Sequence, residues 1–348
     1  MSSAPSLSKP LPTLPLGKDG PSIPAMGIGM MSLGHAYGSA GGDEERLAFL
    51  DAVYALGATH WDDADLYGDT ETLLGKWFRA NPDKRDDVFV TTKFGFAGQD
   101  ASGAYIIRSD PEHIRAACAA SLEKLQSGWI DLYYCHRVDG KTPIEETVKA
   151  MVELKNQGKI RHIGLSEVSA STLRRAYKVH PIAALQIEYS PWALEIESNG
   201  VLDACKELGV AVVAYSPLGR GFLTGTIKSP ADVQGDFRGM LPRFQPENFD
   251  KNLTLVKRIE QLAAAKGVTT SQLVLAWLRR QWPQGIHLLP GTRSVNRVKE
   301  NLAALYVELT DDEDRAIRAA CQECVAIGTR YPEAMEYAQL GETPELEK

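Results

Sequence analysis

Four side chains that could together transfer a proton lie near the ends of three short apolar runs in this 348-residue chain. Asp62 and Tyr67 follow the first run, Lys93 ends the second, and His136 follows the third. A tyrosine phenol titrates near pH ~10 in water, so alone it is a poor proton donor at neutral pH. A nearby ammonium lowers that pKa, and a carboxylate keeps the ammonium charged and in place. Tyr67, Lys93 and Asp62 can fill these three roles, and His136 can orient a carbonyl or share the proton transfer.

The three runs are predicted to be buried strands of a parallel α/β fold. The first starts at Thr59, after a helical pattern that stops at Gly57, and the others cover residues 88–92 and 130–135. Such runs alternate with helical patterns along the rest of the chain, which is typical of a parallel sheet. Five more strands are expected at residues 25–31, 160–165, 183–187, 210–215 and 286–289. Eight strands predict a (β/α)8 barrel, whose active sites lie at the carboxyl ends of the strands.

Several helix ends are predicted from capping residues. Asp43 is expected to cap the first helix, and Asp110 followed by Pro111 marks the start of another. Thr142-Pro-Ile-Glu and Thr310-Asp-Asp-Glu both match a capping box. Further helices are expected at residues 253–265, 270–282 and 294–305. The interval 217–250 has no helical or strand period and is predicted to be a long binding loop or lid.

An Asp, a Tyr, a Lys and a His at the ends of three successive strands resemble the catalytic tetrad of the aldo-keto reductases. The resemblance covers nearly the whole chain, which is similar to the auxin-induced-protein-like and perakine-reductase-like enzymes and their fungal relatives. It implies one TIM barrel domain over residues 1–348 with two extra helices. Residues 1–24 would form an arm and a hairpin, with its turn at 18–20, that closes the bottom of the barrel, and residues 326–348 a C-terminal loop and tail.

The activity implied by the resemblance is reduction of an aldehyde or ketone to an alcohol. A hydride would pass from C4 of reduced nicotinamide to the carbonyl carbon while Tyr67 protonates the oxygen, and neither a metal nor a covalent intermediate is required. Two alternatives remain open. Lys93 could form a Schiff base as in aldolases, although Asp62 favours its charged form. The barrel could instead be a nucleotide-bound sensor or accessory subunit with little turnover.

The implied cofactor is NADP(H), lying across the barrel mouth, because no G-x-G-x-x-G follows an early strand. Ser166 and Gln186 would hydrogen-bond the carboxamide, and Tyr215 would stack on the nicotinamide ring. Glu167 stands where the family usually has Asn, and its carboxylate could still accept from the amide. The full predicted set is Met31, Asp62, Ser166, Gln186, Tyr215, Ser216, Pro217, Leu218, Gly219, Arg220, Gly291, Thr292, Arg293, Arg297 and Asn301.

Two segments of this set are suited to phosphate groups. Residues 215–222 offer glycine backbone N–H groups and Arg220 to a pyrophosphate. Residues 290–301 follow the last strand and open a helix, whose N-terminus favours an anion. There Arg293 and Arg297 would pair with a 2′-phosphate, which favours NADPH over NADH, and Asn301 would reach the adenine.

Substrate choice is expected to depend on the loops over the mouth: residues 94–108, the segment after Phe222, and the tail from residue 326. Their aromatic side chains suggest aromatic or hydrophobic aldehydes and ketones. These side chains are Phe94, Phe96, Tyr105, Phe237, Phe244 and Tyr331, and Trp192, which follows the sixth strand, is expected to join them.

The composition is compatible with an enzyme that acts on small-molecule substrates. A net charge of −7 argues against nucleic acid as a partner. The N-terminal residues lack a signal-sequence pattern, and no apolar run approaches membrane-spanning length, so a cytoplasmic protein is expected. The five cysteines are scattered, which fits reduced thiols, and Cys321 and Cys324 are expected to be ordinary helix residues.

Overall fold

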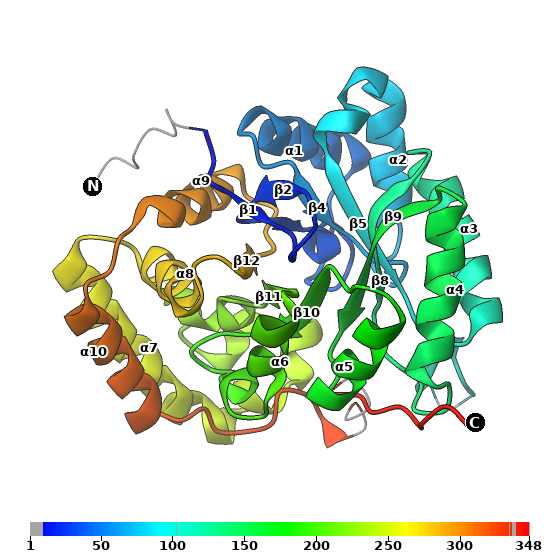
Figure 1. Cartoon of the computed structure of the whole chain (residues 1–348). Coiled ribbons are helices and arrows are strands. Elements are labelled where there is room, and N and C mark those ends of the chain that lie inside the picture. Colours follow the sequence, from blue (N-terminus) through cyan, green and yellow to red (C-terminus); the bar gives the residue numbers. More distant parts are fainter. Residues whose placement is uncertain (1–9, 102, 334, 336–338, 348) are drawn as a thin grey trace.

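The computed structural model describes residues 10–101, 103–333, 335 and 339–347. Eight parallel strands form a barrel with helices around it (Figure 1). In barrel order the strands are β3 (Ile28–Gly29), β4 (His60–Asp62), β5 (Phe89–Phe94), β8 (Ile130–Cys135), β9 (Ile160–Ser166), β10 (Ala184–Glu188), β11 (Ala211–Tyr215) and β12 (Ile286–Leu289). The helices are α1 (Asp43–Ala55), α2 (Thr70–Ala80), α3 (Pro111–Leu125), α4 (Ile144–Asn156), α5 (Ala170–Val179), α6 (Val201–Leu208), α7 (Pro246–Lys266), α8 (Thr270–Gln281), α9 (Val295–Ala303) and α10 (Asp311–Glu323). The predicted fold class is therefore confirmed.

The first and last strands close the barrel through single bridges. Met26 pairs with Leu288, and Gly29 pairs with Gly291, both in parallel. The first strand is much shorter than the predicted 25–31, because the chain turns into a 3-10 helix, η1 (Met30–Leu33), directly after β3. The other seven strands lie within about two residues of the predicted positions, as expected of element boundaries read from sequence.

A hairpin closes one end of the barrel, the end nearest the viewer in Figure 1. Its strands β1 (Thr13–Pro15) and β2 (Ser22–Pro24) pair antiparallel across the predicted turn. Leu16 and Ile23 are buried inside the barrel with Tyr134 and Val213. The hairpin lies at the amino ends of the strands, since Lys18 N–H donates to the carbonyl of Gly209 just before β11. The opposite end, where the strands finish, is left to form the mouth.

Two predicted caps are confirmed. Asp110 accepts a hydrogen bond from the backbone of His113 at the start of α3. At the start of α10, Thr310 and Glu313 form the complete capping box.

Two other capping predictions are wrong, each because the predicted capping side chain is engaged by a nearby charged group. Asp43 is the first residue of α1 rather than its cap, and its carboxylate pairs with Arg46 and Lys76. Before α4, Thr142 makes no capping box. Its N–H and hydroxyl both bond to Asp139, which organises the turn into the helix, and Pro143 occupies the cap position.

The predicted loop at 217–250 is shorter and more ordered than expected. It contains four short 3-10 turns, η4 (Gly219–Thr224), η5 (Pro230–Val233), η6 (Phe237–Met240) and η7 (Pro242–Phe244). Helix α7 starts at Pro246, seven residues before the predicted 253, because proline suits the first turn and Phe249 packs into the core.

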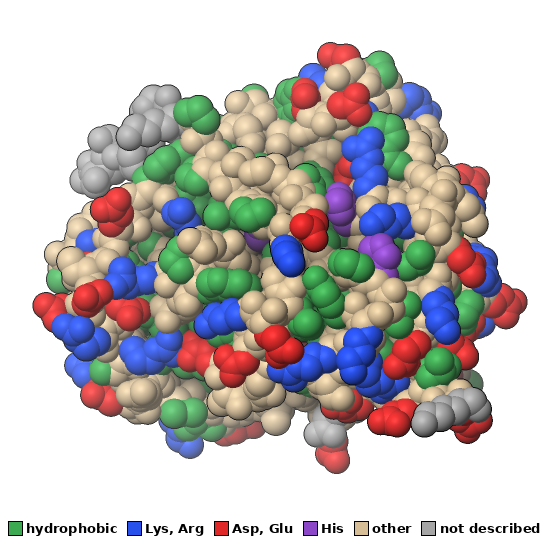
Figure 2. Space-filling model, in the orientation of Figure 1, with side chains coloured by type: hydrophobic (Ala, Val, Ile, Leu, Met, Phe, Trp, Pro, Cys, Tyr) green, Lys and Arg blue, Asp and Glu red, His purple; other side chains and the backbone are tan. Residues whose placement is uncertain are grey.

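Acidic and basic side chains are interspersed around the rim of the hairpin face (Figure 2). All five cysteines are free thiols, with Cys321 buried in α10 and Cys324 at its end. No helix among the described residues is long and apolar enough to cross a membrane. The segment after α10 runs along the lower edge of the view, past α5 towards α4 (Figure 1).

Candidate active site

The buried pair of Lys93 and Asp62 forms the centre of the site. Asp62 ends β4 and Lys93 is the penultimate residue of the neighbouring strand β5. Lys93 is fully buried, and its Nζ donates to Asp62 Oδ1 at 2.5 Å and to the backbone carbonyl of Asp63 at 2.6 Å. The other carboxylate oxygen of Asp62 accepts from Thr91 Oγ1 at 2.7 Å and Gln186 Nε2 at 2.8 Å. Asp62 is thereby held on both oxygens beside the ammonium.

Tyr67 and His136 meet in front of this pair. Tyr67 lies in the turn after β4, where its N–H bonds to the carbonyl of Ala64. Its ring centroid is 5.2 Å from Lys93 Nζ and 6.0 Å from the imidazole of His136, which it meets edge-on. His136 directly follows β8, the strand next to β5. The structure therefore brings all four predicted tetrad residues together at the carboxyl ends of three adjacent strands.

The surroundings of Tyr67 and His136 hold both groups in their neutral forms. Burial, reinforced by the charges of Asp62 and Asp63, raises the pKa of Tyr67 well above its usual value, and Arg137 only partly opposes this. The sequence led us to expect a lowered phenol pKa, but burial and the carboxylates outweigh the nearby cations. Burial and the charges of Arg137 and Lys93 lower the pKa of His136 well below its usual value. Within the described part of the chain, His136 Nδ1 has no hydrogen-bond partner.

Two further acids, Asp63 and Asp65, follow Asp62 closely in the chain. Burial, and then the charge of Glu71, raises the pKa of Asp63 to about 8 and that of Asp65 to about 7. Asp63 Oδ1 accepts from Thr70 Oγ1 and from the Ala64 N–H, but its Oδ2 is buried without a partner among the described residues. A protonated carboxyl is therefore the stable form of Asp63 at neutral pH.

The residues predicted to face the nicotinamide already have partners. Ser166, the last residue of β9, accepts from Arg137 Nη1 at 3.1 Å. Gln186 of β10 donates its amide to Asp62. Tyr215, the last residue of β11, donates its hydroxyl to Glu167 Oε1 at 2.7 Å. These contacts fix the orientation of all three side chains.

Glu167 is more deeply engaged than the sequence suggests. Its carboxylate accepts from Tyr215, from the N–H of Glu188, and from both terminal nitrogens of Arg330 at 3.0 and 3.1 Å. The side chain is fully buried and forms an ion pair with Arg330. We therefore assign Glu167 a structural role, in addition to any contact with the carboxamide of the nicotinamide.

The loop after β11 has the backbone shape of an anion-binding concavity. Ser216, Gly219, Arg220 and Gly221 all have positive φ, and successive residues of this kind orient N–H groups towards one point. Arg220 itself forms a bidentate pair with Glu188 at 3.0 and 2.9 Å, and its side chain is only 5% exposed. A pyrophosphate at this loop would therefore meet backbone N–H groups first.

The start of α9 is suited to a phosphate. Ser294 caps the helix through the N–H of Arg297, and the Arg297 guanidinium is exposed, with no hydrogen bond or ion pair to the described residues. Arg293 is also exposed but donates to the carbonyls of Ser39 and Tyr37. Asn301, on the same helix, is almost buried, and its side-chain amide bonds to none of the described residues. Of the two arginines, Arg297 is thus the more available cation.

The remaining predicted cofactor residues fall around the same mouth. Met31 lies in η1, immediately after the first strand. Pro217 and Leu218 complete the turn after β11. Gly291 pairs with Gly29 across the barrel seam, and Thr292 Oγ1 accepts from the Ser294 N–H. A Cβ at Gly291 would lie 3.3 Å from the carbonyl oxygen of Gly29, so a small residue suits this close approach.

Four of the aromatic residues predicted at the mouth are buried in the core, and one of these, Tyr331, also contacts the hydroxyl of a predicted cofactor residue, Tyr215. Phe94, Trp192, Phe244 and Tyr331 all belong to the main hydrophobic cluster. Phe96 and Tyr105 do reach the site: they lie on the small hairpin formed by β6 (Phe96–Gln99) and β7 (Tyr105–Ile107), and the Phe96 ring centroid is 5.0 Å from that of His136.

Sequence reasoning missed Arg137, Glu188 and Arg330. Arg137 could have been suspected, because it directly follows His136 and donates to that residue's carbonyl and to Ser166. Glu188 closes the strand that carries Gln186, but as a single acid it gave no signal. Arg330 lies in an irregular segment, and no local pattern indicates its contacts across 163 residues.

Comparison with known proteins agrees with this geometry. A profile of the aldo/keto reductase family matches residues 25–322. The chain is 46% identical over 343 residues to aldo-keto reductase str7 of Strobilurus tenacellus, and 44% identical over 343 residues to aldo-keto reductase yakc [NADP(+)] of Schizosaccharomyces pombe. In both cases the match covers 97% of this chain and 99% of the relative.

Solved structures show the same architecture. The glycerol dehydrogenase AKR11B4 from Gluconobacter oxydans matches with a TM-score of 0.78 and 28% identity, over 91% of this chain and 97% of that chain. The thermostable aldo-keto reductase Tm1743, solved with the inhibitor epalrestat, matches with a TM-score of 0.71 and 27% identity, over 89% of this chain and all of that one. Because the family profile spans the barrel and both curated relatives match over nearly their whole lengths, the chain belongs to the aldo/keto reductase family of NADP(H)-dependent oxidoreductases.

Proposed function

We propose that this enzyme uses NADPH to reduce aldehydes or ketones to alcohols, with Tyr67 as the proton donor. The observation that carries the proposal is the grouping of Tyr67, Lys93, Asp62 and His136 at one end of the barrel, with the Lys93 ammonium fully buried against Asp62. Reduced nicotinamide supplies the hydride, and the chain's own groups handle the proton and the developing charge.

Each member of the tetrad has a distinct task. The pKa of Tyr67 is held high, so the phenol keeps its proton until a more basic alkoxide forms beside it. Lys93 adds a fixed positive charge in a site with little water, where it stabilises that developing negative charge. Asp62 keeps Lys93 charged and in position. His136 is neutral and can donate an N–H to the substrate oxygen before the reaction.

The contacts of Lys93 argue against a Schiff-base mechanism. An amine must lose its proton to attack a carbonyl. Here the Nζ donates to a carboxylate and to a backbone carbonyl, and both acceptors stabilise the ammonium form.

We propose aromatic or other apolar carbonyl compounds as substrates. Phe96 packs against both His136 and Tyr105, and so places an apolar wall next to the group that orients the carbonyl. Phe237 is half-buried, and Tyr331, although buried, has its hydroxyl 3.3 Å from that of Tyr215, so both extend the aromatic character of this side.

The direct test is NADPH consumption with a panel of aromatic and aliphatic aldehydes, with NADH for comparison. Tyr67→Phe removes only the hydroxyl and is expected to lower kcat by about 100-fold or more while NADPH still binds, because general acid catalysis contributes roughly that much. Tyr177→Phe, on α5 at the other end of the barrel, is the matched control and should behave as wild type.

The other outcomes discriminate between the alternatives. Equal turnover by Tyr67→Phe and wild type would exclude Tyr67 as the donor. A wild-type protein that binds NADPH tightly and reduces nothing in the panel would instead favour a sensor or accessory subunit.

A further inference from the structure

Two buried carboxylates and two buried guanidinium groups lie together at the mouth, beside the tetrad. Glu167 follows β9, Glu188 ends β10, and Arg220 lies in the loop after β11. Arg330 reaches this group from the C-terminal segment and bonds to both oxygens of Glu167. All four side chains are at most 9% exposed. Charges buried this deeply need partners, so each arginine is held where it can neutralise an acid.

The backbone of Glu167 also ties the C-terminal segment to the barrel. Its φ of 50° lies in the left-handed region, which is unusual for a glutamate. Its N–H bonds to the carbonyl of Gln186 in β10, and its carbonyl accepts from the N–H of Gly341 at 2.7 Å. Such a conformation persists only where surrounding contacts hold it. Glu167 is therefore fixed by contacts to a strand on one side and the tail on the other.

The contacts of Glu167 lead directly to Tyr215. One carboxylate oxygen, Oε1, accepts from Tyr215 Oη at 2.7 Å and from Arg330 Nη1 at 3.0 Å. Tyr331, next to Arg330, approaches the same hydroxyl at 3.3 Å. A shift of the Glu167 carboxylate would remove the hydrogen bond that orients the Tyr215 ring.

We propose that Arg330 is a positioning residue of the cofactor site, which holds the Glu167 carboxylate in place and thereby fixes the ring of Tyr215 against the nicotinamide. The inference rests on the proposed function, because it takes Tyr215 as the ring that stacks on the nicotinamide. A residue of the irregular tail thus sets the position of the hydride donor although it does not touch the reacting atoms.

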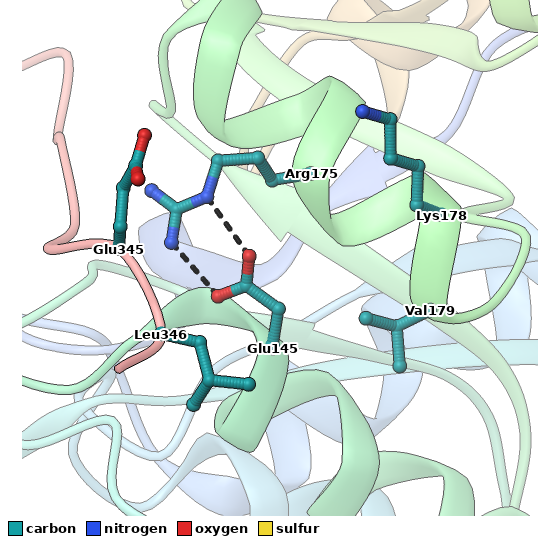
Figure 3. Close-up of a pocket in the computed structure, with 6 residues that line it drawn as sticks. All are labelled: Glu145, Arg175, Lys178, Val179, Glu345 and Leu346. Carbon is teal, nitrogen blue, oxygen red and sulfur yellow. Dashed lines mark hydrogen bonds and ion pairs between the residues drawn. The ribbon is translucent and has the colours of Figure 1, made fainter. Parts of the chain in front are cut away.

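A second attachment of the same tail provides a matched control. Arg175 of α5 forms a bidentate pair with Glu145 of α4 at 2.9 and 2.8 Å, beside a surface pocket of about 360 Å³ (Figure 3). It also donates to the carbonyls of Thr343 and Pro344. The pocket is lined by none of the tetrad residues, so it is not the active site. Arg175→Met would remove these tail contacts without removing any partner of the Glu167 carboxylate.

The experiment compares Arg330→Met, Arg330→Lys and Arg175→Met in the full-length protein. For each variant we would measure KM for NADPH, the single-turnover rate of hydride transfer, and the inhibition constant of adenosine 2′,5′-bisphosphate. This inhibitor carries the adenosine end of the cofactor and lacks the nicotinamide. Arg330→Met should raise KM for NADPH and slow hydride transfer, each by about tenfold, because small misplacements of reacting groups are costly. The inhibitor should bind as tightly as it does to wild type. Arg330→Lys keeps the positive charge but loses the planar guanidinium with its two parallel donors, so its KM and its rate of hydride transfer should lie between those of wild type and Arg330→Met.

Several results would overturn the proposal. An unchanged KM for NADPH and an unchanged rate of hydride transfer in a folded Arg330→Met protein would show that Arg330 does not position the Tyr215 ring. A matching loss in Arg175→Met would mean that tail attachment in general, rather than Glu167, matters. If Arg330→Met does not fold, Arg330→Lys with wild-type kinetics gives the same negative answer. A wild-type protein that does not bind NADPH would refute the proposed function itself, which separates the two failures.

Discussion

At the scale of single residues, the cofactor preference depends on which cation at the start of α9 is free to meet a phosphate. Arg293 is occupied by the carbonyls of Ser39 and Tyr37, whereas the Arg297 guanidinium has no partner among the described residues. A planar guanidinium pairs well with a phosphate, and the helix N-terminus adds to the attraction. Arg297 is thus the residue whose removal best tests the choice of NADPH over NADH.

Arg297→Ala should raise KM for NADPH by about tenfold or more and leave KM for NADH nearly unchanged, because only NADPH carries the 2′-phosphate. The expected loss corresponds to roughly 1.4 kcal/mol, in the range for a hydrogen bond to a charged group. Arg293→Ala should have a smaller effect on the same ratio. Equal increases for both cofactors would place the 2′-phosphate elsewhere.

Asp63 gives a prediction about pH. Its pKa of about 8 in the folded protein is higher than the ordinary value of 3.8, so the folded state binds a proton that the unfolded state has already released. The resulting stabilisation is complete below about pH 4 and is lost as the pH rises towards 8. Asp63→Asn has no such proton, so its stability relative to wild type should increase steadily from pH 5 to pH 8.

Urea unfolding midpoints at pH 5, 6.5 and 8 would check this. Asp139→Asn is a control of opposite sign: although burial opposes it, backbone N–H groups hold the pKa of Asp139 below its usual value, so its contribution is lost only at lower pH. That variant should leave the slope between pH 5 and 8 as in wild type. A pH-independent difference between Asp63→Asn and wild type would show that Asp63 is ionised when folded.

At the scale of elements, the contact between α2 and α3 supports the turn that carries Tyr67. Gly75 of α2 lies against α3 so closely that a Cβ would come within 2.0 Å of the carbonyl oxygen of Lys124. Since α2 begins only three residues after Tyr67, moving the helix would also move this proposed proton donor. The glycine is therefore required for close helix packing.

Gly75→Ala should lower the free energy of unfolding by about 1–3 kcal/mol, as overpacking in a core does. It should also reduce kcat, because the Tyr67 turn shifts with the helix. Gly42→Ala is the control: it stands before α1 with a φ of −80° and has no atom within 4 Å of its added Cβ. Urea midpoints and NADPH turnover of the two variants would be compared, and equal small effects would refute the packing argument.

The strands could be predicted from sequence because their apolar runs are bounded by turn residues, and a barrel brings their ends together. That is why the positions of Asp62, Lys93 and His136 at neighbouring strand ends could be predicted from local patterns. Local patterns failed where a competing group was near: Asp139 bonds to Thr142 and organises the turn before α4, and Arg46 pairs with Asp43, which does not cap α1. The ion pairs of Glu167 and Glu188 could not be predicted, since their partners come from a loop and a tail far away in sequence.

At the scale of the whole molecule, the barrel has two different ends. The hairpin fills one end with Leu16 and Ile23, and His287 lies within 3.3 Å of the carbonyls of Pro15 and Pro24 beneath it. The tetrad and the predicted cofactor residues all lie at the other end. In barrels of this kind the active site generally lies at the carboxyl ends of the strands, which is where the proposed site lies here.

The C-terminal tail is attached at separate points, through Arg330, the backbone of Gly341, and the carbonyls of Thr343 and Pro344. Among the described residues of this tail, 324–333, 335 and 339–347, there is no α-helix and no strand longer than a single bridge. Insertions and deletions there are tolerated better than within regular elements. Changes in chain length between these points would therefore leave the barrel strands, and the side chains at their carboxyl ends, in place as long as the attachments themselves are kept.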